Sequence, residues 1–380
     1  MRRRTWTVLL VSTGVVGAAA CSEPSGPPMR FGRVLQLEDS GYTSANVSFG
    51  DVNADGHLDV VLVKGRHWPL MNLVLEGDGT GGFAPPRPVG DAPDRSYSGV
   101  LVDLDGDGDL DLVVSNDDPD RKVTWMNDGT GHFSFGQTFG EPEWSTRYVS
   151  VADLDGDGLQ DVILANRTGG PPGADYVCWG IGEGRFAEEC SVVSTASATT
   201  ITTADFNGDG APDLVVPFRD GGQSYVHLND GRRGFEERVP FGPPDATIRA
   251  AEALDADGDG VLDLAVIDER AGPALYLGRA GGGFDDGRPL GPSGLHPYAI
   301  HVADLDRDGR TDVILGYVEA RPRVLFNDGG GSFTDVPFGD AEGRAYGFDV
   351  GDVDEDGVLD IGMARSDAPN VLYYGERVRD

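Results

Sequence analysis

The stretch DLDGDGLQD at residues 153–161 decides the fold, because the same pattern returns at regular intervals along the chain. Its consensus is D-x-[DN]-x-D-G-x-x-D, and the chain contains seven copies. These begin at Asp51, Asp103, Asp153, Asp205, Asp255, Asp304 and Asp352, so successive starts lie 52, 50, 52, 50, 49 and 48 residues apart. A period of about 50 residues is typical of stacked supersecondary units rather than of independent domains.

Each repeat predicts the same four short β-strands. An alternating segment such as residues 149–152 precedes the acidic loop, and an apolar run such as residues 161–164 follows it. A third strand, as at residues 324–327, leads through a Gly-rich turn to a Phe that opens the fourth strand, as at Phe133 and Phe333. Four such strands form one antiparallel blade. The sequence therefore predicts an all-β, seven-bladed β-propeller over residues 30–380.

The two ends of the chain complement each other. After Asp360 the last repeat has room for a second strand at residues 361–365 and a third at residues 370–374, but it has no strand opened by Phe. Residues 31–37 (FGRVLQL) match the missing fourth strand. We therefore expect the N-terminal strand to complete the last blade and close the ring, which removes the exposed sheet edges of an open array.

The acidic loops have the composition of cation sites. Calcium takes hard oxygen ligands with negative charge, and Gly at position 6 of every copy permits the sharp turn of such a loop. Positions 1, 3, 5 and 9 can supply side-chain oxygens and position 7 a backbone carbonyl. The predicted ligands are Asp51, Asn53, Asp55, His57 and Asp59; Asp103, Asp105, Asp107, Asp109 and Asp111; Asp153, Asp155, Asp157, Leu159 and Asp161; Asp205, Asn207, Asp209, Ala211 and Asp213; Asp255, Asp257, Asp259, Val261 and Asp263; Asp304, Asp306, Asp308, Arg310 and Asp312; and Asp352, Asp354, Asp356, Val358 and Asp360.

We expect about seven calcium ions per chain, stabilising each blade. Oxygen ligands without Cys or His side chains disfavour zinc and copper. Magnesium is an alternative, and so is a metal-free Asx turn. The net charge of −34 excludes nucleic acid as a natural partner, since an acidic surface repels phosphates.

The repeats resemble FG-GAP and VCBS repeats, the calcium-loop blades of integrin α-subunit propellers and of many secreted bacterial proteins. The resemblance covers about 350 residues. The chain keeps the acidic loop and the Gly-x-Phe turn better than the FG and GAP motifs themselves. The resemblance implies a propeller with calcium on one face and ligands on the opposite face, so that adhesion-like binding is the expected function.

Aromatic and Arg residues gather in the loops expected on that opposite face. The candidate ligand-binding residues are Trp68, Tyr97, Trp144, Arg147, Tyr298 and Tyr346. Aromatic side chains with Arg suit interfaces and sugar stacking, although packing between blades is the alternative for each of them. Three places before consecutive acidic loops stand Glu252, His301 and Asp349, which alternation places in the central channel. Such a group can perform acid–base chemistry or bind a metal ion, or it can simply be solvated.

The N-terminus has the pattern of an export signal. Arg2–Arg4 form a basic region, residues 8–16 an apolar region, and three Ala residues precede Cys21. The segment resembles a bacterial lipoprotein signal, which implies removal of residues 1–20, lipidation of Cys21 and a tether at residues 21–29. Ordinary cleavage after Ala20, with secretion, is the alternative.

Cys178 and Cys190 flank a turn near Gly184, where a hairpin would bring them face to face, so we expect a disulfide rather than two buried thiols. The chain contains no G-x-S-x-G or H-E-x-x-H motif and no phosphate-binding loop. We therefore expect a non-enzymatic, monomeric, lipid-anchored envelope protein that binds a protein or a glycan. A polysaccharide-acting lyase or hydrolase on a calcium-bearing propeller is the alternative, and a purely structural envelope protein is a third possibility.

Overall fold

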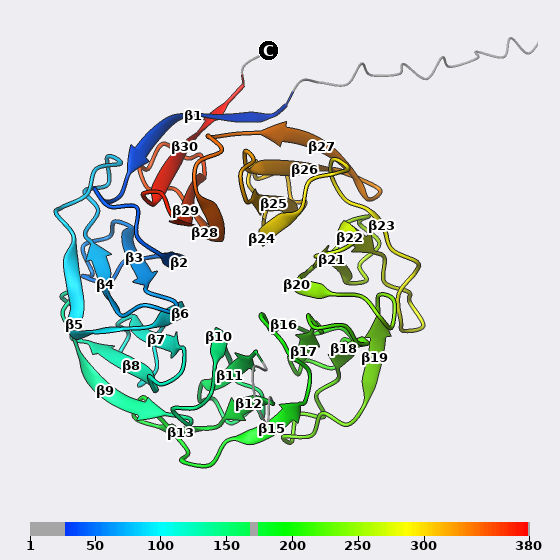
Figure 1. The fold of residues 1–380 in the computed structure, drawn as a ribbon, viewed down its shortest axis with the longest axis horizontal. Coiled ribbons are helices and arrows are strands. Elements are labelled where there is room, and N and C mark those ends of the chain that lie inside the picture. Colours follow the sequence, from blue (N-terminus) through cyan, green and yellow to red (C-terminus); the bar gives the residue numbers. More distant parts are fainter. Residues whose placement is uncertain (1–26, 168–173, 379–380) are drawn as a thin grey trace, which may run out of the picture.

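In the part of the chain that the structure describes, seven four-stranded antiparallel sheets are arranged as the blades of a propeller around a central axis (Figure 1). The computed structural model describes residues 27–167 and 174–378. The predicted signal peptide, Cys21 and most of the tether lie outside these residues. No helix among the described residues is long and apolar enough to cross a membrane.

We number the blades in chain order, each from its innermost strand outward. Blade one contains β2 (Ser44–Gly50), β3 (Asp59–Lys64), β4 (Leu70–Leu75) and β5 (Arg87–Asp94). Blade two contains β6 (Ser96–Val102), β7 (Asp111–Asn116), β8 (Lys122–Asn127) and β9 (Phe133–Phe139). Blade three contains β10 (Thr146–Ala152), β11 (Asp161–Asn166), β12 (Asp175–Cys178) and β15 (Ser191–Ser194), with the small hairpin β13 (Gly180–Gly182) and β14 (Arg185–Phe186) between the last two.

Blade four contains β16 (Thr202–Ala204), β17 (Asp213–Val216), β18 (Ser224–His227) and β19 (Arg238–Phe241). Blade five contains β20 (Ile248–Leu254), β21 (Asp263–Asp268), β22 (Gly272–Tyr276) and β23 (Arg288–Pro289). Blade six contains β24 (Pro297–Ala303), β25 (Asp312–Tyr317), β26 (Arg323–Gly329) and β27 (Ser332–Pro337). Blade seven contains β28 (Arg344–Gly351), β29 (Asp360–Ser366), β30 (Val371–Arg377) and β1 (Met29–Gln36).

The N-terminal strand closes the ring, as the sequence predicts. β1 pairs antiparallel with β30, and its register places Val34 opposite Tyr373 and Gln36 opposite Val371. Figure 1 shows β1 as the outermost strand of the sheet that ends the chain. The predictions of a seven-bladed propeller and of its closure are therefore confirmed.

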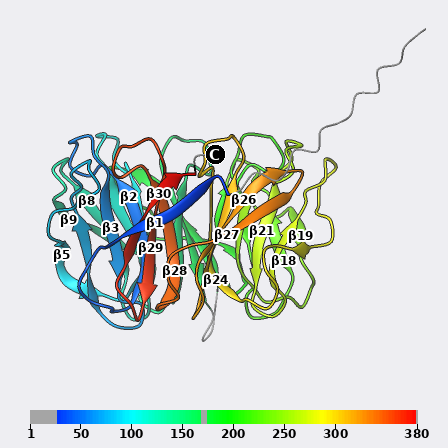
Figure 2. The same ribbon diagram turned by 90° about the horizontal axis from the view of Figure 1, so that it is seen from above.

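The core consists of seven apolar clusters, one between each pair of neighbouring blades. The second strand of every blade is buried at each of its positions, because the two neighbouring blades cover one face of it each. This explains why the sequence there is a continuous apolar run and not an alternating one. Packing between blades thus fixes the loops at the two ends of the ring (Figure 2).

Candidate metal loops and candidate ligand site

The seven acidic loops lie on one face of the propeller. Each joins the first strand of its blade to the second, as the loop between β24 and β25 does. The connections from the second strand to the third, and from one blade to the next, lie at the other end of the strands. The antiparallel topology therefore separates the acidic loops from the face expected to bind ligands.

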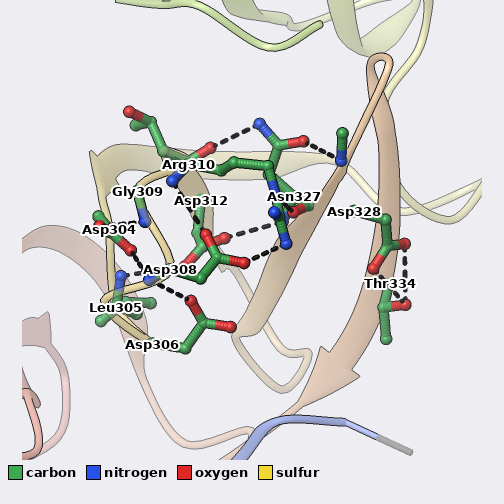
Figure 3. A network of polar contacts seen from close by, with 12 residues as sticks. Asp304, Leu305, Asp306, Asp308, Gly309, Arg310, Asp312, Asn327, Asp328 and Thr334 are labelled. Atoms are coloured by element: carbon green, nitrogen blue, oxygen red, sulfur yellow. Dashed lines mark hydrogen bonds and ion pairs between the residues drawn. The ribbon is translucent and has the colours of Figure 1, made fainter. Parts of the chain in front are cut away.

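The loop of blade six shows how the backbone holds these carboxylates (Figure 3). Asp304 accepts the N–H of Gly309 at 2.9 Å, and Asp308 accepts the N–H of Arg310 at 2.9 Å. Equivalent bonds recur in all seven loops, at 2.9–3.1 Å for position 1 and 2.8–3.0 Å for position 5. The first and fifth carboxylates are thus held toward the same concavity.

Two positions of each loop have left-handed backbone conformations. Position 6 has φ of 84–96°, which agrees with the presence of Gly at this position in all seven copies. Position 4 is also left-handed in every loop, although Ala54, Arg307 and Glu355 occupy it in three of them, with φ of 57°, 59° and 55°. The sequence pattern did not reveal this requirement, because position 4 varies in residue type.

The aspartates at position 9 have a structural role that the sequence analysis missed. In each loop one oxygen accepts the N–H of position 2 at 2.8–3.1 Å. The other oxygen accepts, at 2.7–2.8 Å, an N–H at the end of the third strand. In blade six these donors are Leu305 and Asn327 (Figure 3). Each position-9 aspartate therefore ties its loop to the blade and also points a carboxylate toward the loop.

Burial and neighbouring charges make these carboxylates hard to ionise. Burial raises the pKa of Asp312 and Asp360 to about 7 and that of Asp111 and Asp161 to about 6, against backbone hydrogen bonds that lower it. Burial, followed by the repulsion of the neighbouring carboxylate of Asp308, also raises the pKa of Asp306. A cation in the loop would relieve this repulsion.

Oxygen atoms converge closely enough to hold a metal ion. In five loops three carboxylates each place an oxygen within 4.8 Å of the other two; these groups are Asp103, Asp105 and Asp111; Asp153, Asp155 and Asp161; Asp255, Asp257 and Asp259; Asp304, Asp306 and Asp308; and Asp352, Asp354 and Asp356. The two remaining loops have Asn53 and Asn207 at position 3, where an amide oxygen replaces a carboxylate.

The acidic loop of blade seven contains two carboxylate oxygens without a hydrogen-bond donor. Oδ1 of Asp352 and Oδ1 of Asp354 are buried without a hydrogen-bond donor. A buried carboxylate oxygen without a partner is costly, and both atoms belong to one of the converging groups. The donor set therefore fits a hard cation such as calcium.

Cys178 and Cys190 form a disulfide with their Cα atoms 4.3 Å apart. They stand at the end of the β12–β15 pair, one step beyond the partners Val177 and Ser191. The bond therefore closes the segment that contains the β13–β14 hairpin.

The opposite face is shaped by β-bulges. Six of the seven innermost strands have a register shift near their start, and the residues inserted there are Ala45, Tyr97, Arg147, Arg249, Tyr298 and Tyr346. A bulge re-aims the side chain that it inserts. Five of these side chains are Tyr or Arg, and all six residues line a cavity of about 150 Å³ at the mouth of the channel.

The side chains at this mouth form a continuous chain of contacts, which we call the Arg–Tyr belt. The guanidinium of Arg147 lies 4.2 Å from the ring centre of Tyr97, and that of Arg66 lies 5.6 Å from the same ring and 3.9 Å from Tyr346. The Tyr346 hydroxyl donates to the Tyr298 hydroxyl at 3.2 Å.

The belt continues through blades five and four. The guanidinium of Arg249 lies 3.4 Å from the ring of Tyr298 and 3.1 Å from Glu269, which also binds Arg219 at 2.6 Å. The complete belt is Arg147, Tyr97, Arg66, Tyr346, Tyr298, Arg249, Glu269 and Arg219. Every one of the seven blades contributes to it.

The candidate ligand-binding residues occupy different environments. Tyr97, Arg147, Tyr298 and Tyr346 line the cavity as part of the belt. Trp144 instead stacks on Tyr176 with ring centres 3.9 Å apart and packs against the cluster between blades two and three. Trp68 is 67% exposed and does not line the cavity.

The three channel residues are not joined to one another by hydrogen bonds, although Asp349 and His301 influence each other's pKa. Glu252 and His301 line the same cavity, and Asp349 accepts the N–H of Phe49 at 2.7 Å. No hydrogen bond or ion pair joins any two of these three residues, all of which the structure describes. Burial raises the pKa of Glu252 to about 8 and lowers that of His301, which Asp349 opposes.

The sequence analysis missed Arg219, Arg249 and Glu269 as site residues. Arg219 and Glu269 stand 14 positions after the start of their acidic motifs, and Arg249 stands six positions before one, as do Tyr97, Arg147, Tyr298 and Tyr346. Comparing residues at equal offsets from the seven motifs would have revealed them.

Comparison with known proteins identifies the repeat. The family model described as FG-GAP-like repeat matches residues 51–114, 103–164, 153–216, 205–266, 255–315 and 304–363. Each match begins at an acidic motif and extends to the second strand of the next blade. No curated protein sequence matches the chain.

Several solved structures share the fold. BBS1N in complex with ARL6DN has a TM-score of 0.63 at 12% identity, covering 93% of this chain and 97% of that chain. An Agrocybe aegerita lectin that recognises non-reducing terminal N-acetylglucosamine has a TM-score of 0.58 at 20% identity, covering 85% and 86%. The Neurospora crassa Pan2 WD40 domain has a TM-score of 0.54 at 9% identity, covering 89% and 90%. At these identities the similarity concerns the fold alone.

Proposed function

The chain belongs to the FG-GAP-like repeat family, and we propose that it is a calcium-binding propeller. We propose that it acts as a binding module for a protein or a glycan. The observation that carries the proposal is the separation of two kinds of site on opposite faces. Acidic loops occupy one face, and a cavity lined by Arg and Tyr occupies the other.

Calcium is the cation that we propose for the loops. Its ligands would be the side chains at positions 1, 3, 5 and 9 and the carbonyl at position 7. The ion would supply positive charge among the converging carboxylates. It would also contact the buried oxygens of Asp352 and Asp354, which lack a hydrogen-bond donor. We propose that its role is structural, since the loops connect the two inner strands of each blade.

We further propose an extracytoplasmic, monomeric protein anchored to a bacterial envelope membrane by a lipid on Cys21. The disulfide between Cys178 and Cys190 supports an oxidising compartment. Millimolar calcium outside the cytoplasm would suit loops of this type.

A polysaccharide-acting enzyme is the alternative, and it would use Glu252, His301 and Asp349. These residues lack the mutual hydrogen bonds of an acid–base pair, which supports binding over catalysis. Release of reducing ends from a polysaccharide, abolished by His301→Ala, would establish the alternative.

The proposal is tested by calcium stoichiometry and thermal melting of the purified chain, with calcium and with chelator. We expect about seven ions per chain, and a chelator-induced fall in Tm of more than about 10 °C, because a ligand of the folded state stabilises that state. About two ions or fewer, with an unchanged Tm, would contradict the calcium role.

Matched variants assign the ions to the loops. Asp352→Asn with Asp354→Asn should remove one ion, whereas Asp245→Asn with Asp286→Asn, at exposed positions outside the motifs, should remove none. A glycan array probed with the calcium-loaded chain then separates binding of glycans from binding of proteins.

A further inference from the structure

The mouth of the central channel concentrates positive charge in a strongly acidic protein. Arg147, Arg219 and Arg249 each have side chains exposed by only 11–14%, and Arg66 lies among them. The chain has a net charge of −34, so diffuse surface charge does not account for this cluster.

Carboxylates balance only part of this charge. Asp117 pairs with Arg147 at 2.9 Å, and Glu269 alone serves both Arg219 and Arg249. Four guanidinium groups therefore face two carboxylates. Arg167 is also at the mouth, but it is matched by Asp220 at 3.7 Å.

Burial disfavours the charged form of the acidic groups deeper in the cavity. Burial raises the pKa of Glu252 to about 8, which favours its neutral form at neutral pH. Burial raises the pKa of Asp349 as well, against the opposing effect of His301. At neutral pH the carboxyl group of Glu252 therefore does not neutralise the Arg residues above it.

Arg66 is the cation with an open position. No carboxylate among the described residues pairs with it, and its Nε atom is buried without an acceptor. Its guanidinium donates from Nη1 to Ser366 at 3.2 Å, and its side chain also forms a hydrogen bond with Tyr97. Its backbone has φ of 55°, a costly conformation for Arg that holds the side chain between the rings of Tyr97 and Tyr346.

The cavity also offers groups that suit a polyhydroxylated ligand. Thr200 lines it with a buried hydroxyl that has no partner, and Thr199 and Glu252 add further polar atoms. Its volume of about 150 Å³ is below the ~300–1,000 Å³ of pockets that enclose drug-sized molecules, so it admits one small unit and not an extended chain.

We propose that the channel mouth binds a single carboxylate-bearing sugar unit, a hexuronate, with its carboxylate on Arg66 and its hydroxyls toward Thr200. An acidic peptide fits less well, because its backbone would need an extended groove. Arg presents paired N–H donors to a carboxylate, and buried charges make such bonds strong. This inference rests on the proposed binding function of this face.

The test is calorimetric titration of the calcium-saturated chain with glucuronate and galacturonate. Glucose, galactose, inorganic phosphate and an acidic hexapeptide serve as comparison ligands. We expect one uronate site per chain with millimolar or tighter affinity, and at least about 10-fold weaker binding of the neutral sugars. Equal binding of phosphate and uronate would show that the site recognises an oxyanion and not a sugar. Binding of the peptide alone would show that the site recognises an acidic protein segment. Either result overturns the proposal.

Variants locate the site. Arg66→Gln should weaken uronate binding at least about 10-fold, whereas Arg279→Gln, the same charge change at an exposed position on the acidic-loop face, should leave it unchanged. If Arg66→Gln melts at a lower temperature, Arg66→Lys and Thr200→Val provide milder changes, each expected to weaken binding. Unchanged binding in all three would overturn the proposal. Absence of uronate binding together with normal calcium stoichiometry and melting would remove this inference alone and leave the proposed calcium-loaded module intact.

Discussion

At the scale of single residues, Glu252 shows how the propeller changes the chemistry of a side chain. It lies on β20 in the wall of the channel, where burial raises the pKa of its carboxyl group from an ordinary 4.5 to about 8. The folded state therefore binds the proton more tightly than the unfolded state does. Linkage requires that stability be highest below the unfolded pKa, fall as pH rises between the two pKa values, and level off above about pH 8.

Glu252→Gln should remove this pH-dependent loss of stability. Each pKa unit corresponds to about 1.4 kcal/mol, so the variant should gain at least about 1 kcal/mol in unfolding free energy relative to the wild type between about pH 5 and about pH 9. Urea unfolding in saturating calcium measures the difference. Glu183→Gln, with a side chain 85% exposed, is the matched control. An equal effect of Glu252→Gln at both pH values would contradict the assigned burial.

At the scale of elements, the position-9 aspartates connect the loop to the third strand. Asp312 accepts from Leu305 and from Asn327, both in buried surroundings. The N–H groups would lose their partner if this carboxylate were removed, whether or not a cation is bound. Asp306 lies in the same loop as a candidate ligand without this second role.

Asp312→Ala and Asp306→Ala should therefore differ. Two unsatisfied buried donors cost about 1–3 kcal/mol each, so Asp312→Ala should lower the unfolding free energy by about 2–5 kcal/mol both with calcium and with chelator. Asp306→Ala should be destabilising only with calcium, since it removes a ligand and also a repulsion. Denaturant unfolding under both conditions distinguishes them. A normal stability of Asp312→Ala in chelator would show that the carboxylate acts only through the ion.

The residue whose N–H donates the second hydrogen bond to the position-9 aspartate alternates between Gly and Asn along the ring. Asn127 in blade two and Asn229 in blade four also donate to the loops of the preceding blades, at Val52 and Leu154, both at 2.7 Å. In blade one the equivalent residue is Gly77, where a Cβ would lie 2.2 Å from the carbonyl oxygen of Leu58. Asn therefore links neighbouring acidic loops in blades two and four, whereas Asn327 of blade six donates to Thr311 of its own blade, and the close approach at Gly77 leaves no room for a side chain.

At the scale of the whole molecule, closure depends on a buried polar network where the chain ends meet. Glu38, just after β1, forms an ion pair with Lys64 of β3, and both side chains are 5% exposed. Asn370, just before β30, donates to Glu38 at 2.7 Å and to Ser44 at 2.9 Å. The network thus joins the N-terminal segment to blades one and seven.

Lys64→Met should destabilise the closed ring because it leaves Glu38 buried without its cation. The expected loss is about 3–5 kcal/mol, and adding Glu38→Gln should recover part of it, because a buried pair can be replaced more easily than broken. Unfolding at fixed calcium measures both variants. Arg185→Met, which breaks an exposed pair with Glu183, should change stability by less than about 1 kcal/mol. A similar small effect of Lys64→Met would show that β1 pairing alone closes the ring.

The sequence by itself determined the blades, their number and their closure. The acidic motif recurs at a nearly constant interval, its turn residues mark one loop per blade, and the FGRVLQL segment matches the strand that the last repeat lacks. These features are local, so a pattern along the chain records them directly. The family match confirms the resemblance to FG-GAP repeats that rested on the same motif.

Only the tertiary structure decided which residues form the proposed ligand site. Arg66 and Tyr346 stand 280 positions apart and meet because the ring closes, while Tyr97 and Arg147 face the channel because β-bulges turn them. The same packing placed Trp144 on Tyr176 and not at the cavity, although all of these residues looked alike as candidates in the sequence. The direction of a side chain at a bulge, and its neighbours across a ring, depend on strand pairing and blade contacts between distant segments, which no local pattern encodes.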